Sequence, residues 1–140
     1  MMTKNPIETI EVELGIFIRR FIAATTNKKV GNLDRAAYLL LHQISTHGSA
    51  GVKALAEEFQ LDMSTISRQT AALEQKGYLY RIPDPQDGRA YSMQLTDTGT
   101  AELALNKQAR LEYLTKHLQD WTEEDQQRFG ELLNKFNCTF

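Results

Sequence analysis

The stretch from Val52 to Gly99 constrains the fold of this 140-residue chain more than any other part of it. Apolar residues recur at helical spacing in its first part, at Val52, Leu55, Ala56 and Phe59. Residues 60–62 then form a segment short enough to be a turn between two helices. Asp62 suits the N-cap of the second helix, because its carboxylate can accept amide hydrogens of the first turn. We therefore expect two short helices joined by a tight turn.

The second helix, expected over 63–76, has two faces of different chemistry. One face contains Ile66, Thr70 and Leu73. The opposite face is small and hydroxylated and carries one arginine, with Ser64, Arg68, Ala71 and Gln75 flanked by Thr65, Ser67 and Ala72. Small residues allow close backbone approach, hydroxyl groups bond phosphates or base edges, and arginine can pair with guanine through two hydrogen bonds. This face favours DNA contact over a plain solvated surface, and Gln69 is a further candidate beside it.

A hairpin is expected after Gly77, a residue that can end the helix in the left-handed conformation. Residues 79–82 read as a strand, and residues 83–88 contain the prolines and glycine of a turn. In 91–95 apolar residues alternate with polar ones, which is typical of a half-buried strand. Thr96 can then cap a long helix. Two helices, a turn and a hairpin in this order predict a winged helix-turn-helix, which sets one helix in the DNA major groove.

Three basic residues outside the second helix are candidates for DNA contact. Arg89 lies at the expected tip of the hairpin, and we expect it to enter the minor groove, where the potential is most negative over narrow A·T-rich DNA. Arg81 and Lys53 remain open between contacts to phosphate and plain solvated charges. Lys53 is slightly favoured for a phosphate contact, because it lies at the start of a helix.

The runs Asp84–Ala90 and Leu95–Gly99 resemble the wing of the MarR family of bacterial transcription regulators. The spacing of Arg68, Leu73, Gly77 and Arg81 is also similar to that family's recognition helix and first wing strand. The resemblance covers nearly the whole chain. It implies a dimeric regulator, most often a repressor, with a small aromatic or phenolic effector bound between the dimer layer and the DNA-reading unit. In such wings Asp87 is expected to orient the arginine rather than to touch DNA.

The two ends of the chain are expected to be helical and to pair two copies. Residues 7–22 are apolar on more than one face, 33–47 form a second helix with Ala36 and Ala37 inward, and 96–121 form one long helix. A last helix follows Thr122, with an apolar stripe at Phe129, Leu132, Leu133 and Phe136. These stripes have little of their own domain to pack against, so we expect a homodimer and an inverted-repeat operator.

The expected organisation is one mainly α domain with a small β-wing over 1–140. Residues 1–32 and 97–140 are assigned to a dimerisation layer, and residues 33–96 to the winged helix-turn-helix region. Net charge is −2, and residues 52–96 carry five basic against six acidic side chains. Such a balance argues against binding by bulk positive charge. A winged-helix module that binds proteins, without sequence-specific DNA binding, therefore stays open as the alternative.

Other functional classes have little support in the sequence. Motifs for phosphate loops, hydrolase nucleophiles and metalloproteases are absent, so neither an enzyme nor a cofactor is expected. His42, His47 and His117 are scattered and Cys138 is the one cysteine, a poor set for a metal site or a thiol sensor. No apolar run suits a membrane span or a secretory signal. One cysteine cannot form an internal disulfide, so a reducing cytoplasm is the expected location. The spacing of residues does not identify an effector pocket. Tyr38 and His42 are the two candidates named for it.

Overall fold

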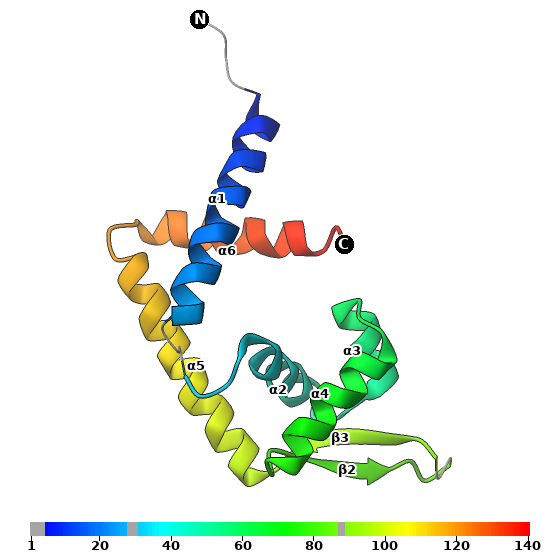
Figure 1. Ribbon diagram of the computed structural model, residues 1–140. Helices are drawn as coiled ribbons and strands as arrows, with labels where there is room; N and C mark the ends of the chain where they lie inside the picture. Colours follow the sequence, from blue (N-terminus) through cyan, green and yellow to red (C-terminus); the bar gives the residue numbers. More distant parts are fainter. Residues whose placement is uncertain (1–4, 28–30, 87–88) are drawn as a thin grey trace, which may run out of the picture.

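The computed structural model describes residues 5–27, 31–86 and 89–140, which form a mostly helical molecule with a small sheet (Figure 1). Its elements are α1 (Pro6–Asn27), α2 (Arg35–His47), β1 (Ala50–Gly51), α3 (Val52–Phe59), α4 (Met63–Gln75), β2 (Leu79–Pro83), β3 (Tyr91–Leu95), α5 (Asp97–His117) and α6 (Glu123–Asn137). The mainly α class with a β-wing is confirmed. Among the helices in these ranges, none has both the length and the apolar character needed to span a membrane.

The core lies where α2, α3 and α4 meet the sheet and the first half of α5. Its buried residues are Leu33, Leu40, Leu41, Ile44, Ala50, Leu55, Ala56, Ile66, Leu73, Leu79, Met93 and Leu103. The described residues of α1 and α6 contribute none of them. Figure 1 shows these two helices at the end of α5 that is remote from the sheet. The half of the molecule around the sheet therefore has a core of buried side chains, to which the described residues of α1 and α6 do not contribute.

The sheet is three-stranded and antiparallel, with the order β1-β3-β2, which corrects the two-stranded ribbon expected from the sequence. In β1, Ala50 pairs with Met93, and Gly51 pairs with Ser92. The strands of the hairpin pair from Leu79–Leu95 to Pro83–Tyr91. A strand of two residues is too short to show alternation of apolar and polar side chains, and so its sequence gave no signal.

Two helix boundaries also differ from the prediction. The long helix ends at His117 rather than at Trp121, because the chain turns so that the Trp121 ring packs edge-on against Phe129, with ring centres 5.4 Å apart. The Gln126 amide donates to the Leu118 carbonyl (3.1 Å), which satisfies an acceptor left open at the helix end.

Helix α2 begins at Arg35 rather than at Leu33, because Asp34 caps it by accepting the Ala37 N–H at 2.8 Å. Leu33 lies before this cap and is buried in the core. The start at Arg35 places Leu40, Leu41 and Ile44 on the buried face. Ala36 is exposed, so its predicted inward position is wrong, whereas Ala37 is partly buried against the core.

The base of the wing is tied to the helices on both sides of it. Gly77, with φ of 84°, ends α4, and the next N–H, that of Tyr78, donates to the Leu73 carbonyl at 3.0 Å. Thr96 closes the other side, because its hydroxyl donates to the Gly77 carbonyl (2.6 Å) and accepts the Gly99 N–H (3.0 Å). A Cβ at Gly99 would overlap the Tyr78 carbonyl oxygen. The wing therefore leaves α4 and enters α5 through one fixed junction.

Candidate nucleic-acid interface

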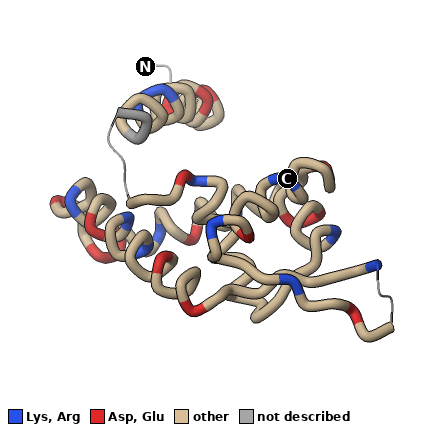
Figure 2. Tube along the Cα trace, turned by 60° about the horizontal axis from the view of Figure 1, so that its bottom comes forward, with Lys and Arg blue, Asp and Glu red and all other residues tan. Residues whose placement is uncertain are grey.

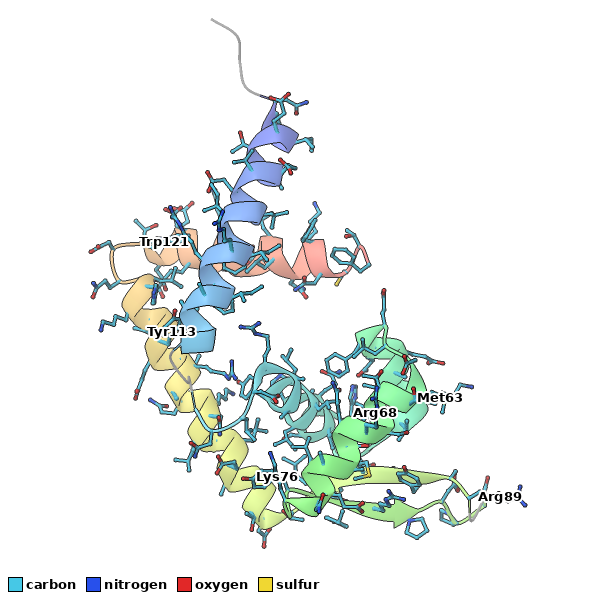
Figure 3. All side chains as sticks on the ribbon, in the orientation of Figure 1. Met63, Arg68, Lys76, Arg89, Tyr113 and Trp121 are labelled. Atoms are coloured by element: carbon cyan, nitrogen blue, oxygen red, sulfur yellow. The ribbon has the colours of Figure 1, made fainter. Side chains whose placement is uncertain are left out.

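Helix α4 presents the two faces that the sequence predicts. Ile66, Thr70 and Leu73 are buried, and the Thr70 hydroxyl is satisfied by donating to the Ile66 carbonyl at 2.9 Å. Ser64, Arg68, Ala71 and Gln75 are exposed. Thr65, Ser67 and Gln69 are half-buried along its sides. In Figure 3 Met63 and Lys76 mark the two ends of this helix, with Arg68 between them and Arg89 at the far end of the hairpin.

The first turn of α4 is organised by Asp62. One oxygen of its carboxylate accepts the Thr65 N–H (2.6 Å) and the Ser64 hydroxyl (2.8 Å). Hydrogen bonds from Thr65 and Ser64, with a smaller contribution from the charge of Arg68, lower the pKa of Asp62 from 3.8 to about 2. The cap is therefore a carboxylate at neutral pH. Since the one hydroxyl proton of Ser64 is directed to this cap, its lone pairs remain for another molecule.

The Asp62 cap predicts a pH dependence of stability. Its pKa is lower in the folded chain than the ordinary 3.8, so its contribution is present above about 3.8 and is lost as pH falls through about 2. Urea unfolding of the wild type and of Asp62→Ala, measured across this interval, should show a stability difference that shrinks toward the acid end. A difference that stays constant from neutral pH to pH ~2 would contradict this linkage.

Arg81 links the wing to α4. Its Nε donates to Glu74 Oε1 at 3.1 Å, and its guanidinium lies 4.3 Å from the centre of the Tyr91 ring. Neither partner is near Arg81 in the chain, so the sequence predicts for it only a phosphate contact or a solvated charge. The side chain remains 47% exposed, so one face of it is still open to solvent.

The far end of the hairpin carries Arg89, which is exposed. The strands are closed near it by a hydrogen bond from the Asp84 N–H to the Ala90 carbonyl at 3.0 Å. Asp87 and Gly88 lie outside the described residues, and so does the predicted contact between Asp87 and Arg89.

An open groove of about 870 Å³ separates the wing from α3 and α4. Lys53 from the start of α3, Ser67 from α4 and Arg89 from the wing all line it. The groove therefore brings together three of the predicted site residues from three elements, whereas Ser64, Thr65, Arg68 and Gln69 lie outside its lining. Tyr91 also lines the groove, and the sequence analysis missed it because its alternation with polar residues indicated only a strand.

Charge over the molecule is mixed rather than segregated. Figure 2 shows Lys and Arg interspersed with Asp and Glu along the helices. Glu57 also lines the groove beside Lys53. Any attraction for a nucleic acid must therefore come from individually placed cations rather than from a basic face.

Tyr38, His42 and Cys138 are the candidates for an effector pocket, a metal site or a thiol sensor. Tyr38 and His42 stack with ring centres 6.3 Å apart on α2, and the Arg110 guanidinium lies 4.4 Å from the centre of the Tyr38 ring. Cys138 is exposed near the end of the chain. In the part of the chain that the structure describes, no group of three or more His, Cys, Asp or Glu side chains could hold a metal ion.

Comparisons with known proteins agree on one family. The model of the MarR family matches residues 33–91. The HTH-type transcriptional regulator YxaD of Bacillus subtilis is 46% identical over 100% of this chain and 99% of that relative. Among solved structures, FabT of Streptococcus pneumoniae in complex with DNA has a TM-score of 0.71 at 19% identity and covers 94% of each chain. PcaV of Streptomyces coelicolor in complex with its natural ligand has a TM-score of 0.75 at 22% identity and covers 96% of each.

Proposed function

Because this chain belongs to the MarR family and is a DNA-binding transcription regulator, we propose that it reads an inverted-repeat operator as a homodimer. The family is one of regulators, not of enzymes. In this proposal residues 33–96 read DNA, and residues 1–32 and 97–140 form the dimerisation layer. Two α4 helices, one from each copy, enter successive major grooves about 34 Å apart.

The groove between the helices and the wing is the observation that carries this proposal. It places Lys53, Ser67 and Arg89 around one space, as a DNA strand passing between a recognition helix and a wing would require. Lys53 then binds phosphate, and Arg89, oriented by Asp87, enters the minor groove. The base edges are read from the exposed face of α4 by Ser64, Thr65, Ser67, Arg68 and Gln69. Arg81 reaches phosphate with the part of its side chain that Glu74 and Tyr91 leave open.

The uncovered apolar surface of α1 and α6 supports the homodimer. Large apolar side chains are exposed on both helices, at Ile7, Ile10, Val12, Phe17, Ile18, Ile22, Phe129, Leu132, Leu133 and Phe136. A groove of about 490 Å³, lined mainly by apolar and aromatic side chains, lies between α1, α5 and α6. A monomer rarely exposes an apolar surface of this extent. A second copy related by a two-fold axis would cover the same surface on both chains.

The regulatory outcome proposed here is repression that a small aromatic or phenolic effector relieves. The likeness to PcaV, which was solved in complex with its natural ligand, supports the binding of an effector. The position between the dimer layer and the reading unit is where α2 meets α5, and Tyr38 lies there between His42 and Arg110. An effector at this junction would act by favouring one of two pre-existing spacings of the α4 helices.

Substitution of Arg68 and of Lys53 tests the reading of bases against the binding of phosphate. Arg68→Ala should reduce discrimination between operator and random DNA by about 1–3 kcal/mol, because base contacts are lost. Lys53→Ala should weaken binding to both DNAs together and reduce the salt slope by about one. Binding titrations at several salt concentrations measure both quantities. Arg128→Ala is the matched control, since Arg128 is an exposed cation paired with Glu124 on α6.

The possible results separate the two functions considered for this chain. An unchanged specificity ratio in Arg68→Ala would move base reading to Ser64, Thr65 or Gln69. A wild-type protein that binds every DNA equally, or none, would favour the protein-interaction module instead.

A further inference from the structure

Leu33, which directly precedes the cap of α2, is held on α5 by both polar groups of its backbone. Its N–H donates to Asn106 Oδ1 at 2.9 Å, and its carbonyl accepts Arg110 Nη2 at 3.1 Å. Asn106 and Arg110 are one helical turn apart, so they lie on the same side of α5. Leu33 is 6% and Asn106 1% exposed. Two side chains of α5, far away in the sequence, thus hydrogen-bond to the backbone of one buried residue.

The orientation of Asn106 is fixed by its other contacts. Its amide nitrogen donates to the Glu102 carbonyl (2.8 Å) and to Glu102 Oε1 (3.1 Å), so its oxygen must face Leu33. Gly31 lies close to the side-chain amide of Asn106, because a Cβ at Gly31 would overlap the amide oxygen. At Gly31 the backbone therefore lies so close to α5 that there is no room for a side chain.

Arg110 connects Leu33 with a side chain of α2. Its guanidinium lies over the Tyr38 ring, 4.4 Å from the ring centre, while it also donates to Leu33. Figure 1 shows α5 running from the base of the wing to the side of the molecule where α1 and α6 lie. The contact of Leu33 with the middle of α5 therefore lies between α4 on one side and helices α1 and α6 on the other.

We propose that Leu33 is the pivot between the dimer layer and the reading unit, with Asn106 and Arg110 as the positioning residues that set the separation of the two α4 helices. The inference rests on the proposed function, because it requires a dimer that reads two half-sites. If the hydrogen bonds to Leu33 are lost, its buried N–H has no partner, and the reading unit, with the first half of α5 packed in its core, can tilt relative to α1 and α6. The dimer should then accept operators of several spacings.

Operators that differ only in spacing measure this tilt. Each added base pair moves one half-site by about 3.4 Å along the axis and about 35° around it, since a turn holds 10–10.5 base pairs. The starting sequence is the inverted repeat that the wild-type protein selects from randomised DNA. Spacers from two base pairs shorter to two longer, a range of about four-tenths of a helical turn in all, would form the series.

Asn106→Ala and Gly31→Ala should both make operator affinity depend less on spacing. The first variant removes the side-chain amide of Asn106, and the second displaces it. The affinity ratio between the best and the neighbouring spacing should fall about fivefold or more, the lower end of typical coupling between sites. The double variant should add little to either single variant, because both act on one contact. Gly48→Ala is the matched control, since Gly48 has φ of 81°, close to the 82° of Gly31, but a Cβ there meets nothing within 4 Å.

A further variant separates a loss of folding from a loss of the spacing preference. If Asn106→Ala does not fold, Arg110→Gln, which removes only the bond to the Leu33 carbonyl and the contact with Tyr38, should flatten the preference in the same way. Folded, dimeric variants that keep the wild-type preference would overturn the pivot alone. A wild-type protein without any spacing preference would overturn the paired reading and the pivot together.

Discussion

Replacing Leu132 and Phe136 together with glutamate should convert the proposed homodimer into monomers that no longer bind the proposed inverted-repeat operator tightly. Both side chains lie on α6 and are 61% and 42% exposed in the single chain, so charge there leaves the core of the reading unit intact. In the dimer the same carboxylates would be buried without partners, which is costly. Loss of the second half-site should lower operator affinity by about 10²–10⁴-fold.

Sedimentation equilibrium and operator titration measure the two parts of this result. The matched control is Gln127→Glu with Asn134→Glu, which adds the same charge to α6 at exposed polar positions and should leave a dimer. A wild-type protein that is monomeric at micromolar concentration, and still binds its operator tightly, would contradict the paired arrangement. If the double-glutamate variant does not fold, the sedimentation of the wild type still decides the question.

Arg89→Ala should give the second large effect, a loss of operator affinity of about 1–3 kcal/mol for each wing. In the proposed dimer each wing binds its own half-site, so the two losses should add. Arg89 is exposed at the end of the hairpin, and the core lies elsewhere, so thermal stability and dimerisation should change little. Operator titration beside thermal unfolding tests both statements. Wild-type affinity in this variant would remove the wing from the interface.

Local chemistry explains why many of the helix ends and the hairpin could be predicted from the sequence. Asp62, Thr96 and Thr122 each accept an amide hydrogen from the residue three positions on, as N-caps do. Gly77 takes the positive φ that ends α4. The hairpin follows from residues that set turn dihedrals and from the alternation in β3. In each case the signal and its effect lie within a few residues of chain.

Features that depend on distant residues could not be predicted in this way. The bond between Leu33 and Asn106 joins positions 73 residues apart, and the pairing of β1 depends on β3. The contact of Arg81 with Glu74 requires the angle between wing and helix, which no periodicity specifies. The assignments of Ser64, Thr65, Ser67, Arg68, Gln69 and Lys53 to DNA stay predictions, because the approach of the duplex depends on how two copies are joined.

Selection of bound sequences from randomised DNA by the full-length wild-type protein tests the central claim most directly. Paired reading by two α4 helices predicts enrichment of an inverted repeat whose half-site centres lie about one helical turn, 10–10.5 base pairs, or a multiple of it apart. Enrichment of a single unpaired half-site, or of no sequence at all, would contradict it.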